Sequence, residues 1–385
     1  MKMVTLNLDG KHPHYVVPED IWRMNFDSDA RADVEIPNPP NSFSQCLSFE
    51  PVPLDWRQLL RLKERFGVLT YKGNDVAVLE YLSHPKCSVY EFGWSEHGQR
   101  QLDFSDARKL HSLSVEVLSK AFRLTLPLRE GLRSLRIVRP PGGCRLTVHA
   151  PDLGRGLILT IVEGILPKIS GLKQIEGLEF IRASEVDLDA VVRAYPHLEY
   201  IRVFGKSVTL AGIASLARLR SLKKMWFNSC YAMNAAEFPE LNELPLLEDV
   251  NFDGLRVEDA AILKNKYKGV KQLRIAGKRS AEWIANNLDN PFRNWDEDFG
   301  RAAGNKAMQA WTTASTELKK LADGNATRAR EILKAYVDVF NQMERRSGLE
   351  TDQRELIYEA FTELASRLPS GIVSDDDYYD WAEYS

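Results

Sequence analysis

The sequence has little of what marks a secreted, membrane-bound or metal-dependent protein. Its 385 residues include only four cysteines, and none of them lies in a closely spaced pair. This spacing excludes the common zinc patterns and a dense disulfide framework, so reduced and buried thiols are expected. No stretch approaches the length of about 18 apolar residues that a membrane span needs, and the first residues lack the apolar core of a secretory signal. We therefore expect a cytoplasmic protein with no membrane partner.

Recognisable catalytic motifs are also missing. The sequence contains no His-Glu-x-x-His, no Gly-x-Ser-x-Gly and no kinase-type set of motifs. The segment 204–207 ends like a phosphate-binding loop, but Tyr200 stands where such a loop needs its first glycine. The sequence therefore predicts no enzyme, no cofactor and no metal site.

Charge is unevenly distributed along the chain. The formal net charge is −3, which argues against nucleic acid as the default partner. Residues 281–385 hold 12 Lys and Arg against 20 Asp and Glu, whereas residues 1–280 hold 39 against 34. A mildly basic region therefore precedes an acidic one, which indicates at least two modules.

One pattern recurs through the middle of the chain. The order apolar–x–x–apolar–x–apolar starts at Ile175, Leu198, Leu222, Leu247 and Val270, at intervals of 23, 24, 25 and 23 residues. A period of this length is typical of stacked repeats, in which each unit buries its apolar face against its neighbours.

Earlier copies of the pattern are less regular. They start at Phe66, Val89, Leu110 and Leu132. The 43 residues between Leu132 and Ile175 leave room for one degenerate copy, which we place near Leu153 although Gly156 then falls at an apolar position.

The repeat that starts at Leu222 carries a family resemblance. It reads Leu222-Lys-Lys-Met225-Trp-Phe227-Asn-Ser-Cys230 and matches the L-x-x-L-x-L-x-x-N/C unit. Residues 66–278 thus resemble leucine-rich repeat proteins, in a bacterial type with irregular repeats. The resemblance implies an α/β solenoid, with a curved parallel sheet and helices on its convex side. Return helices are expected around residues 187–193, 211–219 and 257–264.

The pattern divides the chain into four predicted regions. They are an N-terminal capping region (1–60), a leucine-rich repeat solenoid (61–280), an α-helical bundle (281–370) and an acidic aromatic tail (371–385). Within the bundle, apolar periodicity predicts helices over 299–321, 327–343 and 352–368, the last with Thr351 as its N-cap. The tail is either flexible or folds against a basic surface.

A candidate binding surface follows from strand geometry. Positions 1, 4 and 6 of each unit point into the core, so positions 3, 5 and 7 share the concave face. Solvent-facing aromatic and arginine side chains are typical of interface hot spots. The alternative is that the same aromatics form ordinary core beneath the ends of the chain. In the later units, the predicted partner-binding residues are Tyr200, Arg202, Phe204, Lys224, Trp226, Asn228, Asp249, Asn251 and Asp253.

These features favour a non-catalytic protein-binding module. Asp249 and Asp253 form an acidic corner that suits a basic partner. The layout resembles bacterial repeat proteins, several of which are encoded near toxins or secretion systems. That resemblance implies an immunity protein or inhibitor that covers a toxin or effector with its concave face. Two alternatives stay open, an adaptor that bridges two proteins and an enzyme or effector with an unrecognised catalytic site.

Overall fold

The computed structural model has a mixed α/β fold in two compact units, Met1–Arg279 and Ser280–Ser385. No helix among the described residues is long and apolar enough to cross a membrane. The structure describes residues 2–9, 15–19, 21–27, 31–36, 43–48, 53–62, 66–127, 131–293, 295, 300–321, 325–369 and 371–383.

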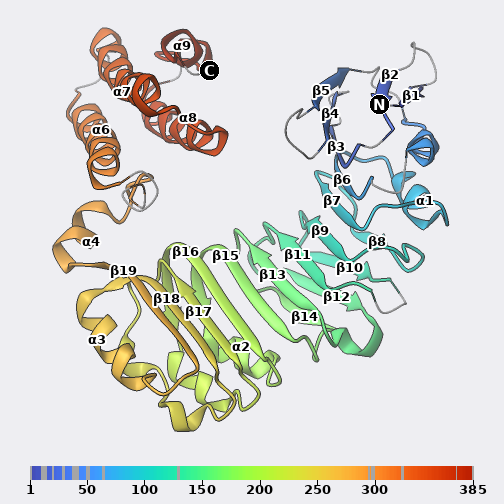
Figure 1. Ribbon diagram of the computed structural model, residues 1–385, viewed down its shortest axis with the longest axis horizontal. Helices are drawn as coiled ribbons and strands as arrows, with labels where there is room; N and C mark the ends of the chain where they lie inside the picture. Colours follow the sequence, from blue (N-terminus) through green and yellow to red (C-terminus); the bar gives the residue numbers. More distant parts are fainter. Residues whose placement is uncertain are drawn as a thin grey trace. The chain divides into compact units, whose positions relative to one another are not determined.

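The first unit is built on a sheet of 13 strands in which neighbouring strands are mostly parallel (Figure 1). Each repeat interval contributes one strand to it. These strands are β6 (Val68–Lys72), β7 (Glu91–Ser95), β9 (Ser112–Glu116), β11 (Ser134–Val138), β13 (Ile158–Val162), β15 (Gly177–Asp187), β16 (Tyr200–Ala211), β17 (Lys224–Asn228), β18 (Asp249–Arg256) and β19 (Gln272–Arg279).

The first 60 residues extend this sheet. Strand β3 (Arg23–Asp27) runs parallel to β6, and β4 (Arg31–Ile36) and β5 (Phe43–Ser48) follow it in antiparallel pairing. Met24 and Phe26 of β3 are buried opposite Leu69 and Tyr71. The segment Ile21-x-x-Met24-x-Phe26 is therefore a further copy of the pattern, which sequence analysis missed because 45 residues separate it from Phe66. The remaining strands here, β1 (Met3–Leu6) and β2 (Tyr15–Pro18), form a separate antiparallel pair.

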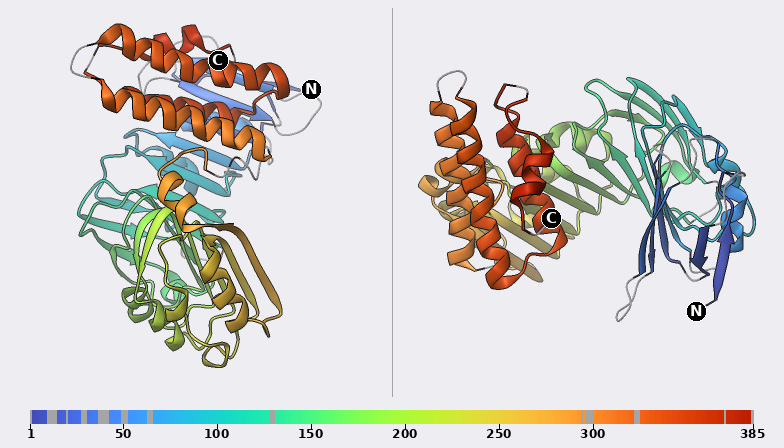
Figure 2. Two further views of the ribbon diagram at one scale, coloured as in Figure 1. Left: turned by 90° about the vertical axis from the view of Figure 1, so that its left-hand side faces the viewer. Right: turned by 90° about the horizontal axis from the view of Figure 1, so that it is seen from above.

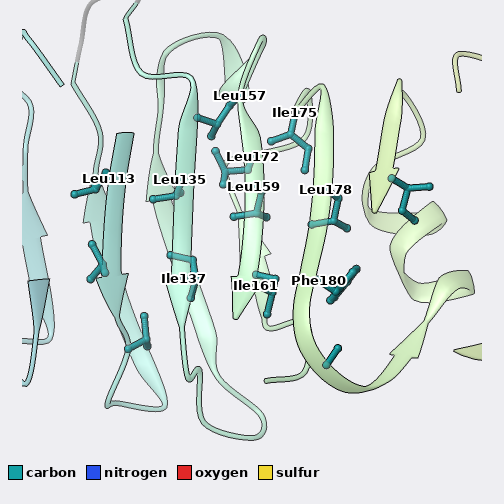
Figure 3. Packing of buried hydrophobic residues seen from close by; sticks show 14 of the residues in the cluster. Leu113, Leu135, Ile137, Leu157, Leu159, Ile161, Leu172, Ile175, Leu178 and Phe180 are labelled. Atoms are coloured by element: carbon teal, nitrogen blue, oxygen red, sulfur yellow. The ribbon is translucent and has the colours of Figure 1, made fainter. Parts of the chain in front are cut away.

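In-register pairing stacks the fourth and sixth residues of each interval into one core. Leu135 and Ile137 pair with Leu159 and Ile161, and all four are fully buried. Figure 3 shows this continuous row of apolar side chains. The degenerate copy therefore starts at Gly156, not Leu153. Our placement was wrong because it fixed on Leu153, a residue that is exposed in a turn.

The segments that return the chain to the next strand differ between the two halves of this unit. Helices α2 (Leu188–Ala194) and α3 (Val257–Lys266) and the 3-10 helix η3 (Ile213–Arg218) lie where helices were expected. In the earlier intervals, α1 (Val78–Ser83) follows β6, but the next return segments are strands, where the resemblance implied helices. There, β8 (Gln101–Asp103), β10 (Ala121–Thr125), β12 (Arg145–His149) and β14 (Lys168–Ser170) form a second parallel sheet (Figure 1).

The reason for this difference is local periodicity. Phe122 and Leu124 alternate with exposed residues along β10, and Leu146 and Val148 do the same along β12. A period of two suits a strand packed on one face, whereas a helix needs apolar residues three and four apart. The short segments β8 and β14 pair with these two strands.

Most intervals share a left-handed residue at the same position. The eighth residue has φ between 48° and 74° in seven of them, namely Glu96, Arg139, Glu163, Arg182, Ser229, Gly254 and Gly277. Left-handed backbone is uncommon outside glycine. In four of these intervals the strand ends just before this residue, whereas β15, β18 and β19 continue beyond it.

Cysteines 87, 144 and 230 are free and buried, as expected, and the side chain of the fourth lies outside the described part. Burial raises the pKa of each of these three thiols. They therefore stay protonated near neutral pH and act as small apolar side chains.

The second unit is helical, with its own core. Tyr336, Phe340 and Phe361 are buried in it, and the ring of Phe292 lies 5.0 Å from that of Phe340. Figure 2 shows α6 and α7 side by side. The helices are α4 (Ala281–Asn287), α6 (Arg301–Lys320), α7 (Ala326–Ser347), α8 (Thr351–Ala365) and α9 (Asp375–Trp381).

Two details of the helical unit differ from expectation. The N-cap of α8 is Glu350, which forms a reciprocal capping box with Gln353, so Thr351 is the first helical residue. Residues 375–381 of the expected tail form α9, and Tyr378 is buried against Phe361. This segment therefore packs on the core of the helical unit, and two of its acidic side chains also contact arginines. The charge partners are Arg330 for Asp377 and Arg345 for Glu383.

We expect Leu159→Ala to lower the free energy of unfolding by about 2–5 kcal/mol, because it opens a cavity in the stacked core. Arg136→Ala, on the exposed face of the neighbouring strand, should change it by less than about 0.5 kcal/mol. Urea denaturation of both variants checks this, and equal losses would contradict the register of β13.

His97 should make the first unit sensitive to acid. Its Nδ1 accepts a hydrogen bond from the Gln99 N–H (3.0 Å), so Nε2 carries the proton and donates to the Glu116 carbonyl (2.6 Å). Burial lowers the pKa of this fully buried ring below its ordinary value of 6.5, against the opposing effect of Glu116.

The unfolded chain therefore binds a proton more readily than the folded one. The contribution of His97 to stability is complete above about pH 6.5 and is lost as the pH falls toward the lowered pKa. We expect His97→Asn to show a smaller loss of unfolding free energy than wild type between about pH 7 and 5. Identical pH slopes would show that His97 does not titrate on unfolding.

Candidate protein-binding surface

The nine predicted partner-binding residues form a three-by-three grid on adjacent strands. Pairing between β16, β17 and β18 aligns them row by row. The rows are Tyr200–Lys224–Asp249, Arg202–Trp226–Asn251 and Phe204–Asn228–Asp253. Neighbouring strands lie about 4.8 Å apart, so members of a row are in contact range. We call this grid, with the flanking residues of β15 and β19, the solvent face.

Alternation along each strand separates the solvent face from the core. In β17, Met225 and Phe227 are buried. Trp226, which stands between them in the sequence, is half-buried, and Lys224 is exposed. Phe204 is 40% exposed, which is unusual for a large apolar side chain on a sheet.

Four of these residues make a compact square with two different diagonals. Tyr200 pairs with Lys224 on the neighbouring strand, and Arg202 pairs with Trp226, so these two pairs form opposite edges of the square. On the aromatic diagonal, the rings of Tyr200 and Trp226 meet edge to face with centroids 5.6 Å apart. Lys224 and Arg202 occupy the other diagonal. The Arg202 guanidinium also lies 5.8 Å from the Trp226 ring, within cation–π range.

Glu179 on β15 supports one side of the square. Its Oε1 accepts a hydrogen bond from the Tyr200 hydroxyl (2.9 Å), and its Oε2 accepts one from the Thr160 hydroxyl (3.2 Å). Arg202 Nη1 lies 3.8 Å from Oε1. Gly177 leaves room for the Tyr200 ring, since a Cβ there would lie 2.9 Å from the ring's Cδ1.

Burial, and then the negative charge of Glu179, raise the pKa of Tyr200 well above its ordinary value. Tyr200 therefore remains a neutral hydroxyl at any physiological pH and keeps donating to the carboxylate. The square is thus held in place before any partner arrives.

The expected acidic corner is not free. Asp249 Oδ1 accepts a hydrogen bond from Trp226 Nε1 (3.1 Å), and Asp253 lies 3.8 Å from Arg274. The hydrogen-bonded neighbours of these carboxylates could not be seen in the sequence, because they depend on cross-strand geometry. Both carboxylates thus have a partner within the protein, and the suggestion of a basic partner at this corner stays a prediction.

Thr160 is the residue of this network that sequence analysis missed. Because the degenerate repeat was placed wrongly, no residue of β13 was assigned to positions 3, 5 and 7 of the solvent face. Once the repeat starts at Gly156, Thr160 falls at position 5, opposite Glu179. The apolar pair Leu159 and Ile161 was the signal that could have located it.

Polar atoms on the solvent face are incompletely paired. Arg202 Nε, Asn228 Oδ1 and Asn251 Oδ1 are buried and make no hydrogen bond with any described residue. An unpaired buried polar atom costs about 1–3 kcal/mol, so the face is not optimised for the stability of the free protein. Such local costs are concentrated at functional sites.

We also looked for metal ligands in the described part of the chain and for similar known proteins. No group of three or more His, Cys, Asp or Glu residues there could hold a metal ion. No family model matches the sequence. The search of curated proteins finds no match either.

We expect Phe227→Ala to lower the free energy of unfolding by about 3–5 kcal/mol, because Phe227 fills the core. Trp226→Ala, one residue earlier on the opposite face, should cost less than half as much, since Trp226 is only partly buried. Chemical denaturation of the two variants tests the assignment of faces. A larger loss for Trp226→Ala would reverse it.

Proposed function

We propose that the chain is a leucine-rich repeat solenoid that binds another protein through the solvent face. The regular intervals of the sequence and the in-register parallel strands support this architecture. The observation that carries the function is the square of Tyr200, Arg202, Lys224 and Trp226. It combines solvent-facing aromatic area with cations on one face of the sheet, as interface hot spots do.

Within this proposal the protein is a non-catalytic inhibitor of bacterial type, acting as an immunity protein against a toxin or effector. It would cover the active surface of its partner, and it needs no chemistry of its own. Specific complexes bury roughly 1,600 Å² in total, so the contact would extend beyond the grid to neighbouring strands.

An adaptor is the second candidate, and one observation favours it. A cavity of about 390 Å³ lies between α6 and α7, with a floor that includes Ala310, Ala335 and Val339. A groove of this kind between two helices suits an apolar helix of a second protein. An enzyme with an unrecognised site is the weakest candidate, because no group of three or more His, Cys, Asp or Glu in the described part of the chain could hold a catalytic metal.

We expect Trp226→Ala and Arg202→Ala each to weaken binding of the partner by about 1–3 kcal/mol, since truncating a hot-spot residue leaves its contacts unmade. The partner is first captured from a lysate and purified, and its affinity for each variant is then measured by calorimetry. Circular dichroism spectra should not change.

Lys264→Ala serves as the control, because Lys264 is exposed on α3, whose buried residues pack on the opposite side of the sheet. The proposal fails if Trp226→Ala and Arg202→Ala both bind the partner as tightly as this control does.

A further inference from the structure

On the solvent face, acidic and basic side chains differ in their exposure to solvent. Its carboxylates are largely covered, with side-chain exposures of 17% for Glu179 and 24% for Asp253. Its cations reach solvent, with exposures of 35% for Arg202 and 71% for Arg274. A partner therefore meets the cations first, although the charges nearly balance in number.

Hydrogen bonds explain why the acids are unavailable. Both oxygens of Glu179 accept from hydroxyl groups, and Asp249 accepts from the indole N–H of Trp226. These donors are neutral, and the Arg202 guanidinium lies farther away, 3.8 Å from Glu179. A basic partner would have to break such bonds to reach the acids.

The cations, in contrast, keep donors available. Lys224 Nζ makes no ion pair or hydrogen bond within the described part of the chain, and it is exposed. Arg202 has one ion pair, at the long distance of 3.8 Å. These two residues stand on one diagonal of the square, on either side of the Tyr200–Trp226 pair.

We infer that the partner is a protein that places a carboxylate between Arg202 and Lys224 and an apolar or aromatic side chain over Trp226 and Phe204. This inference rests on the proposed binding function of the solvent face and names the chemistry of its ligand. A carboxylate at that point receives two cationic donors, and charge-assisted hydrogen bonds are about twice as strong as neutral ones.

Nucleic acid would also offer negative charge and stacking, but the distribution of charge argues against it. Residues 1–280 carry a net charge of only +5, and the exposed cations of the solvent face alternate with residues of other types. Binding a nucleic acid backbone requires several cations in line with successive phosphates.

The test is a selection of random 16-residue peptides displayed on phage, with the full-length protein as bait and Trp226→Ala as counter-selection. Enriched peptides are synthesised, and their affinities are measured for wild type, Lys224→Glu and Lys264→Glu. The last variant makes the same change of charge on α3. A labelled 20-nucleotide oligothymidine is titrated in parallel.

We expect enriched peptides to contain Asp or Glu beside an aromatic or large aliphatic residue. Lys224→Glu should weaken them at least tenfold, Lys264→Glu by less than twofold, and replacement of the peptide's acid by Lys should restore binding to Lys224→Glu. Raising the salt concentration should weaken the wild-type complex.

Two different failures are distinguishable. Peptides that depend on Trp226 but are basic or neutral would overturn the inference and leave the binding function standing, as would oligothymidine binding that requires Trp226. If selection yields no binder that depends on Trp226, both the inference and the proposed function are wrong.

Discussion

In-register parallel pairing is the constraint from which the rest of the first unit follows. When each strand repeats the pairing of its neighbour, residues at equivalent positions must stand in rows. The fourth and sixth positions then merge into one apolar core, and the positions between them share the opposite face. A left-handed residue recurs at the eighth position of most intervals and turns the backbone at an equivalent point. A single register shift would send Phe227 outward and Trp226 inward.

The same constraint places chemically different residues against each other on the solvent face. Tyr200, Arg202, Lys224 and Trp226 come from two strands, and none is adjacent to another in sequence. Glu179 then fixes Tyr200, and Asp249 fixes Trp226, through neutral donors. Since rigid side chains lose little entropy on binding, this arrangement favours association over the alternative of mobile surface residues.

Much of this could be predicted from the sequence, because the repeat period and the alternation of side chains are both visible there. The rows of the grid follow from the starts at Leu198, Leu222 and Leu247 alone. Other features needed three-dimensional contacts. The copy at Ile21 was hidden by the long insertion after it, and the copy at Gly156 by a glycine at an apolar position. The state of Asp249 and Asp253 depends on side chains of neighbouring strands, which no local pattern encodes.

Hydroxyl-radical footprinting with mass spectrometry tests the central claim most directly, in the free protein and in its complex with the captured partner. The account predicts that Tyr200, Phe204 and Trp226 are oxidised in the free protein and protected in the complex. Phe227 and Phe252, which face the core, should remain unmodified in both. The account is contradicted if Trp226 and Phe204 are unreactive in the free protein, or if the partner leaves their oxidation unchanged.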